Sequence, residues 1–216
     1  MSVASELWWK RPLPPRHRFW ALVCAFLVLA FETVATIAIP TDLPTMVRKA
    51  DLVFTGKVVG QKAEWADRNG RKSIVTIVSF EVLETHKGAA GAKVDLRCPG
   101  GTIGDTTLEM VGMPSFKNGE KCVLFARTNA NAVCPIVGIY HGKLLVTTPA
   151  SGGDETLARH NGRPLNALSE IGKDDEGPLA APALAAAAQA GPVKLKELKA
   201  RIAEEAARAN SAQGGK

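Results

Sequence analysis

"SIVTIVSFEVLE", residues 73–84, carries apolar side chains at both sets of alternating positions. One set holds Val75, Ile77 and Leu83, and the other holds Ile74, Val78, Phe80 and Val82. Successive side chains of a β-strand point to opposite faces of a sheet. The stretch therefore predicts a strand that is buried on both faces or shared between two layers.

Six further stretches around this one also predict strands, because they combine β-branched and aromatic residues and are bounded by turn residues. They are residues 51–60, 92–98, 106–112, 119–127, 132–140 and 142–148. Asn69-Gly70 favours a tight hairpin turn. Short strands at this spacing are typical of a sandwich or a small closed barrel, and we favour the barrel. Residues 41–50 predict a short helix before the first strand, with Thr41 or Asp42 as its N-cap.

The two ends of the chain differ from this all-β middle. Residues 166–192 predict a linker, because the part from Gly177 onward is almost all alanine, proline and glycine. Residues 193–210 predict an amphipathic helix with one apolar stripe, formed by Leu195, Leu198, Ile202 and Ala206. The stripe either docks on the barrel of the same chain or binds a partner.

The N-terminal residues 1–38 have the pattern of a secretory signal peptide. Basic residues precede a short apolar run at residues 19–31, and small residues follow it. Ala35 and Ala38 are the candidate cleavage sites. The alternative is a membrane anchor at residues 19–39, against which Glu32 counts, since a carboxylate within a span is costly. We therefore expect an exported protein, periplasmic or extracellular, or one anchored in the membrane through this segment.

Five stretches together resemble a known group of proteins: "KADLVFTGKV", "TIVSFEVLETHKG", "VDLRCPGG", "GMPSFKNGEKCVLFAR" and "GIYHGKLLV". They are similar to uncharacterised exported bacterial proteins whose domain resembles the OB-fold barrel of netrin-like modules and tissue inhibitors of metalloproteinases. The likeness covers residues 41–148 and implies an OB-like barrel of five to six strands, which we place at residues 41–165. Those inhibitors bind the protease zinc through an N-terminal cysteine. Neither Thr36 nor Ile39, the residues after the candidate cleavage sites, is a cysteine, so this mechanism does not carry over.

The glycine-rich stretch "CPGGTIGD", residues 98–105, predicts a turn rather than a phosphate site. A phosphate loop needs a helix directly after its glycines, and residues 106–112 do not have a helical pattern. Pro99 and the glycines instead provide the freedom to reverse the chain.

Three cysteines follow the signal segment: Cys98, Cys122 and Cys134. An exported protein can join two of them. Cys122 with Cys134 and Cys98 with Cys134 are the leading pairs, and three buried thiols are the alternative. The histidines, His17, His86, His141 and His160, have no metal-ligand spacing and read as solvated loop residues. The sequence predicts no metal and no cofactor.

Two apolar groups within polar loops are candidates for recognition. Trp65 lies in the predicted first hairpin loop with Arg68 and Arg71, and Met113 and Phe116 lie in the loop of residues 112–120. Each group could instead cover an end of the barrel. With a formal charge of +6 and no dense basic stripe, the chain is not expected to bind nucleic acid.

These features predict a non-enzymatic module that binds an unknown protein or envelope ligand. The first alternative is an inhibitor of an extracellular protease by another route than zinc capture. The second is an enzyme whose histidine or cysteine site is assembled from distant positions.

Overall fold

A computed structural model gives the fold, and it describes residues 41–68, 70–127, 134–149, 152–173 and 191–213. These residues belong to one unit of the chain, Ile39–Lys216. The predicted signal peptide or anchor, with Ala35 and Ala38, lies outside the described residues, as does most of the predicted linker. No described helix has the length and apolar character needed to cross a membrane.

The predicted fold class is confirmed: strands dominate, a short helix precedes them and a longer helix ends the chain. The helices are α2 (Leu43–Lys49), η2 (Ile139–Gly142), η3 (Leu168–Glu170) and α4 (Leu195–Gln213). The strands are β1 (Leu52–Arg68), β2 (Arg71–Lys87), β3 (Lys93–Pro99), β4 (Gly101–Ile103), β5 (Thr106–Leu108), β6 (Lys121–Ala126), β7 (Lys143–Thr147) and β8 (Thr156–Arg159). Asp42 is the N-cap of α2 and accepts a hydrogen bond from the Thr45 backbone N–H.

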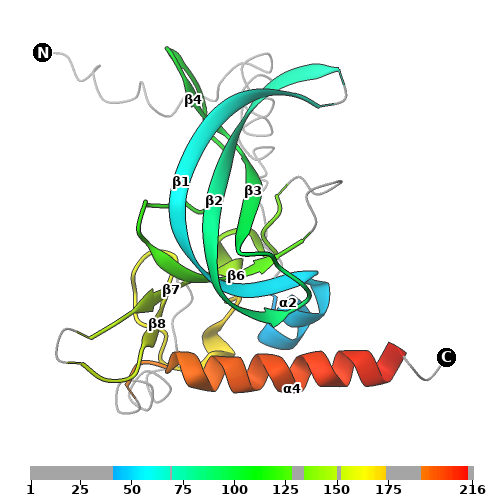
Figure 1. The fold of residues 1–216 in the computed structure, drawn as a ribbon, viewed down its shortest axis with the longest axis vertical. Helices are drawn as coiled ribbons and strands as arrows, with labels where there is room; N and C mark the ends of the chain where they lie inside the picture. Colours follow the sequence, from blue (N-terminus) through cyan, green and yellow to red (C-terminus); the bar gives the residue numbers. More distant parts are fainter. Residues whose placement is uncertain (1–40, 69, 128–133, 150–151, 174–190, 214–216) are drawn as a thin grey trace, which may run out of the picture. The chain divides into compact units, whose positions relative to one another are not determined.

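Six antiparallel strands form one sheet in the order β3-β2-β1-β6-β7-β8, and β4 and β5 form a separate hairpin. β1 and β2 make a long curved ribbon (Figure 1). They join beside Gly70, whose φ of +74° fits the turn predicted there. The ribbon includes residues 61–68 and 71–72, which the sequence reading assigned to a loop.

The described sheet is open, since its edge strands β3 and β8 are not paired with each other. The strand predicted at residues 132–140 is absent from the described part of that stretch, where Ile136 makes a single bridge to Ala126. Gly138 and Ile139 have φ values of +68° and +58°, and this left-handed backbone cannot continue a strand. One strand of the predicted barrel is therefore replaced by a turn in its described part. The described strands do not form a closed barrel.

The sheet carries a hydrophobic core on each side. The helix-side core lies against α2 and α4 and includes Val53, Val123, Phe125, Leu144, Leu157, Leu198 and Ile202. The ribbon-side core includes Phe54, Phe80, Leu96, Leu124 and Ile136. β6 is the strand buried on both faces. The two-sided burial predicted for β2 is wrong on one side: Phe80 is buried, but Leu83 is 48% exposed.

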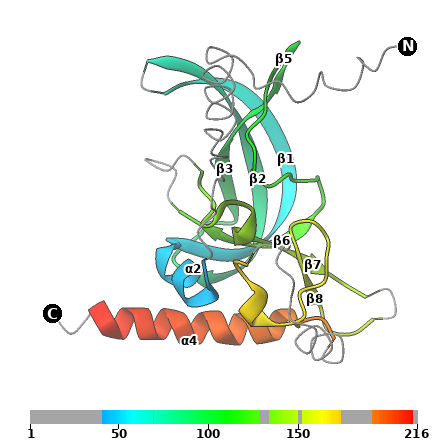
Figure 2. The ribbon, with the colours of Figure 1, turned by 180° about the vertical axis from the view of Figure 1, so that it is seen from behind.

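α4 docks on its own sheet beside α2 (Figure 2). Leu195, Leu198 and Ile202 are buried in the helix-side core, and Ala206 packs against it. The backbone leading into α4 also pairs with β8, because Leu157 N–H donates to Val193 O and Leu195 N–H donates to Glu155 O. The apolar stripe is thus covered by the chain itself.

The packed body continues past residue 165, where the barrel domain was predicted to end. Leu165 and Ile171 are buried in the helix-side core. Gly172 O accepts a hydrogen bond from Thr41 N–H, which ties this segment to the start of the described chain. Residues 166–173 therefore pack on the domain, although the sequence reading placed them in the linker.

Candidate functional site

A groove of about 360 Å³ opens between the ribbon, the β4–β5 hairpin and the segment 109–116. We call it the ribbon groove. Its lining residues are Gln61, Thr76, Val78, Cys98, Pro99, Gly100, Gly101, Thr102, Thr107, Leu108, Glu109, Met110, Met113, Pro114, Ser115 and Phe116. Val78, Cys98 and Phe116 also belong to or pack against the ribbon-side core, so the groove extends from that core to solvent.

One wall of the ribbon groove is the predicted turn after β3. Gly100 and Gly101 have φ values of +98° and +137°, and they redirect the chain from β3 into β4. Thr76 Oγ1 donates a hydrogen bond of 2.7 Å to Gly100 O. A Cβ on Gly101 would overlap that threonine oxygen, so this close approach requires glycine. The predicted turn is therefore confirmed at Gly100 and at residues 104–105, but residues 101–103 of the stretch form β4.

Another wall is the segment 109–116, which carries Met110 and Met113. Met113 N–H donates to Met110 O, and Gly112 between them has a φ of +83°. Val111 stands at the tip of this turn with 98% of its surface exposed. The wall therefore presents apolar side chains both to the ribbon groove and to solvent.

Phe116 anchors the end of this wall in the ribbon-side core. Its ring lies 5.4 Å from the ring of Phe80 in an edge-to-face arrangement. Gln61 Nε2 donates a hydrogen bond of 3.0 Å to Phe116 O. A residue on the ribbon thus fixes the backbone of the segment that faces it.

Lys143 is buried beside the end of the segment 109–116 and makes three contacts there. Its side chain is 2% exposed, and its Nζ lies 2.5 Å from Glu120 Oε1. The ammonium also donates to Ser115 O at 2.5 Å and lies 4.6 Å from the centre of the Phe116 ring. A buried charge requires such partners, so Lys143 holds residues 115–120 in place.

The structure brings together some of the residues proposed for recognition. Met113 and Phe116 both line the ribbon groove. Trp65 lies on β1 rather than in a loop, is 52% exposed and does not line the groove. Arg68 and Arg71 lie opposite each other in the register where β1 meets β2, and their side chains lie outside the described part of the structure.

Most of the groove lining was not predicted from the sequence, and Gln61, Thr76 and Met110 are three examples. The first two are polar residues on long strands, and nothing in their local sequence marks them as groove residues. Met110 had a signal, because an apolar pair, Met110-Val111, precedes the loop of residues 112–120.

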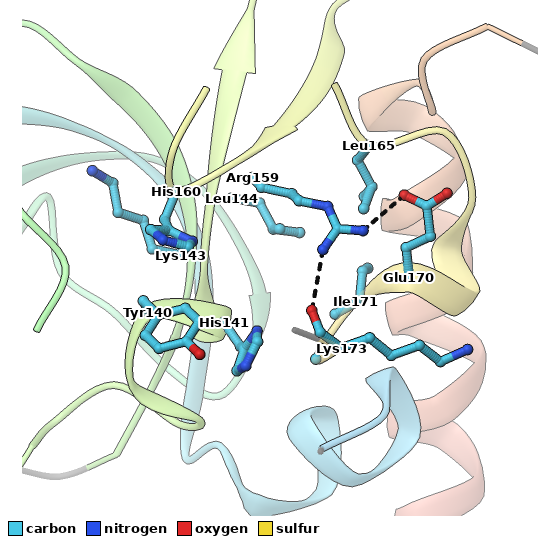
Figure 3. A pocket seen from close by; sticks show the side chains of 11 residues that line it. Tyr140, His141, Lys143, Leu144, Arg159, His160, Leu165, Glu170, Ile171 and Lys173 are labelled. Carbon is cyan, nitrogen blue, oxygen red and sulfur yellow. Dashed lines mark hydrogen bonds and ion pairs between the residues drawn. The ribbon is translucent and has the colours of Figure 1, made fainter. Parts of the chain in front are cut away.

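A second, smaller pocket lies beside η2 and β8 (Figure 3). The ring of Tyr140 lies 4.2 Å from that of His141 and 4.6 Å from that of His160. Arg159 Nη2 pairs with Glu170 Oε2 at 3.1 Å. The pocket measures about 20 Å³, which is room for about one water molecule. His141 and His160 are half-buried here rather than solvated, but the pocket is too small for a ligand.

His86 was also predicted to be a solvated loop residue, and this prediction is wrong. It lies on β2 with its side chain 5% exposed. Its Nε2 is 2.7 Å from Thr55 Oγ1, and its Nδ1 is 3.7 Å from Glu84 Oε1. The Glu84 carboxylate also pairs with Lys199 of α4. Burial lowers the pKa of His86, opposed in part by the Glu84 carboxylate.

His86→Gln is expected to reduce the acid sensitivity of the fold. A histidine with a lowered pKa binds its proton more weakly when folded, so its stabilising effect is present above the unfolded pKa of 6.5 and is lost as pH falls through the folded value. Urea unfolding at pH 7 and pH 5 measures this loss. Glu84 titrates below 4.5 and contributes little in this window. Equal losses in the variant and the parent would contradict the assignment.

Cys98, Cys122 and Cys134 are free thiols in this structure, so neither of the two leading pairs is joined here. Cys122 lies on β6, whereas Cys134 lies on no strand. Burial raises the pKa of Cys98 and of Cys122 to about 12, which leaves both thiols protonated at neutral pH. Among the described residues, no group of three or more histidine, cysteine, aspartate or glutamate side chains is arranged to hold a metal ion.

Comparison with known proteins adds no evidence on the groove or on the fold. The likeness to netrin-like modules stays a prediction. No family model, no curated protein and no solved structure matches the chain at a significant level.

Proposed function

We propose that the chain is an exported, non-enzymatic binding module whose ribbon groove takes an extended peptide segment of a partner protein. The observation that carries the proposal is the groove itself. Its volume of about 360 Å³ lies within the range of 300–1,000 Å³ that is typical of ligand sites. It is also continuous with the ribbon-side core, so an apolar side chain entering it adds to an existing packed cluster.

The two walls of the groove match the two kinds of group in a peptide. Leu108, Met110, Met113 and Phe116 supply apolar surface for a side chain, and thioether side chains adapt to varied shapes. The other wall carries Thr102, Thr107 and the glycine backbone of the turn, which offer hydrogen-bonding groups to a peptide backbone. This combination favours a peptide over a purely apolar ligand.

Met113→Asp is expected to weaken peptide binding at least 10-fold, because a carboxylate in the apolar wall must lose water without a partner. The ligand would be a peptide selected from a random 12-residue phage-displayed library on the purified protein, and fluorescence anisotropy would measure its affinity. Leu83→Asp is the matched control, since it places the same charge at an exposed apolar position outside the groove. Equal weakening by both variants, or by neither, would refute the groove as the binding site.

A protease inhibitor is the second candidate, and the exposed tip at Val111 favours it. An apolar side chain that is 98% exposed on a tight turn can enter the cleft of a protease. Titration of the chain against a panel of extracellular serine and metalloproteases tests this candidate. Inhibition that is lost in Val111→Asp and kept in Leu83→Asp would select it over simple peptide binding.

A further inference from the structure

Cys98 and Cys134 come from two parts of the chain that do not pair with each other in the sheet. Cys98 is on the edge strand β3, where it is buried in the ribbon-side core. Cys134 packs against the same core. Its segment is attached to β6 through the bridge between Ile136 and Ala126 and through the hydrogen bond from Arg127 N–H to Pro135 O. The two thiols therefore approach one cluster, which also contains Cys122, from the edge strand β3 and from the segment that follows β6.

The surroundings of the three thiols indicate which two of them can form a disulfide. Ile136 pairs antiparallel with Ala126, so Cys134, two residues before Ile136, lies beyond the end of β6, whereas Cys122 lies four residues before that end. Burial raises the pKa of Cys98, and Cys134 raises it further. The charged groups near Cys122 are Lys143 and Glu120. Cys122 is also held on both sides by strand pairing, opposite Gly56 and Leu145. Of the three pairs that the sequence left open, the structure favours one.

We propose that Cys98 and Cys134 form a disulfide in the oxidised protein, while Cys122 stays a buried thiol. The bond links the edge strand β3 to the segment that follows β6, two parts of the chain that are not paired in the sheet. Cys98 also lines the ribbon groove, so the disulfide joins a groove-lining residue to that segment.

The reaction is an exchange with a disulfide oxidant, such as oxidised glutathione. Cys134, which is half-buried, is the more accessible thiol. Its thiolate attacks one sulfur of the oxidant and releases the first thiol. The Cys98 thiol then loses its proton as it attacks Sγ of Cys134 in the mixed disulfide, and the second thiol is released. Two protein thiols are oxidised, one oxidant disulfide is reduced, and the protons pass to solvent and the released thiolates.

Peptide mapping tests the pairing directly, because trypsin separates the three cysteines. Cleavage after lysine and arginine places Cys98 in peptide 98–117, Cys122 in 122–127 and Cys134 in 128–143. The full chain is incubated with oxidised glutathione, alkylated and digested without reduction. We expect peptides 98–117 and 128–143 to be joined and peptide 122–127 to be alkylated. Alkylation of all three peptides, or any linked peptide containing Cys122, would overturn the proposal.

Thermal unfolding gives a second readout with a matched control. A reducing agent is expected to lower the melting temperature of the parent and of Cys122→Ser by roughly 5–10 °C, and to leave Cys134→Ser unchanged. Equal sensitivity of all three proteins to the reductant would overturn the proposal. If a variant does not fold, the mapping of the parent still decides the pairing.

The inference rests on the proposed export only for the oxidising compartment, since the pairing itself is tested with added oxidant. Failure of the disulfide would leave peptide binding in the groove intact. Loss of peptide binding would in turn leave the mapped pair unchanged.

Discussion

Phe80→Ala is expected to lower the free energy of unfolding by about 4 kcal/mol. The ring is fully buried in the ribbon-side core and makes edge-to-face contacts with Phe54 at 5.7 Å and with Phe116 at 5.4 Å. Its removal leaves a cavity next to the groove wall that Phe116 anchors, and both aromatic contacts are lost. Urea unfolding followed by circular dichroism measures the change.

Leu83→Ala is the matched control for Phe80→Ala, because it removes an apolar side chain from the same strand at a position that is 48% exposed. It is expected to cost less than about 1 kcal/mol. A cost below 1 kcal/mol for Phe80→Ala as well would mean that the ribbon-side core is not packed as described. The description of the groove as an extension of that core would then fail.

Gly172→Ala is expected to destabilise the protein by about 3 kcal/mol. The residue has a φ of +80°, which costs an alanine about 1 kcal/mol. In addition, the new Cβ would overlap the backbone carbonyl of Thr41. Backbone atoms cannot rotate away as a flexible side chain can, so the segment carrying Ile171 must shift out of the helix-side core.

Gly162→Ala separates the two causes. Gly162 has a similar φ of +85°, but a Cβ there would meet no atom within 4 Å. It is expected to cost only the conformational part, about 1 kcal/mol. Chemical denaturation of both variants measures the difference. Equal costs would show that residues 170–173 do not pack against the start of the described chain.

The sequence predicted the strands best where turn chemistry and apolar content agree. Gly70 takes the positive φ that its turn requires, and β3, β6 and β7 begin within two residues of the predicted strands. The extent of β1 was missed because residues 61–68 are mostly polar. In a two-stranded ribbon such residues face solvent, so the alternation of apolar and polar residues that marks a strand is weak there.

The turn at Gly138 and Ile139 could not have been predicted from residue type. Isoleucine is β-branched and strongly favours extended backbone, yet Ile139 has a φ of +58°. Tertiary packing overrides this preference, since Gly142 fits against the carbonyl of Val137, where a Cβ would overlap it.

Only part of the candidate site could be predicted from the sequence. Apolar residues in a polar loop pointed to Met113 and Phe116, which line the groove. Gln61 and Thr76 join them only because the ribbon curves past that loop, and Trp65 lies outside the lining. A contact between residues more than 50 positions apart, such as Gln61 with Phe116, has no local signal.

The most direct test of the binding account is a spectrum of the protein labelled with ¹³C at its methionine methyl groups, recorded with and without a phage-selected peptide. Met110 and Met113 line the groove, whereas Met46 is buried in the helix-side core. The account predicts that the peptide shifts the signals of Met110 and Met113 and leaves that of Met46 in place. A peptide that binds while the Met110 and Met113 signals stay unchanged would contradict it.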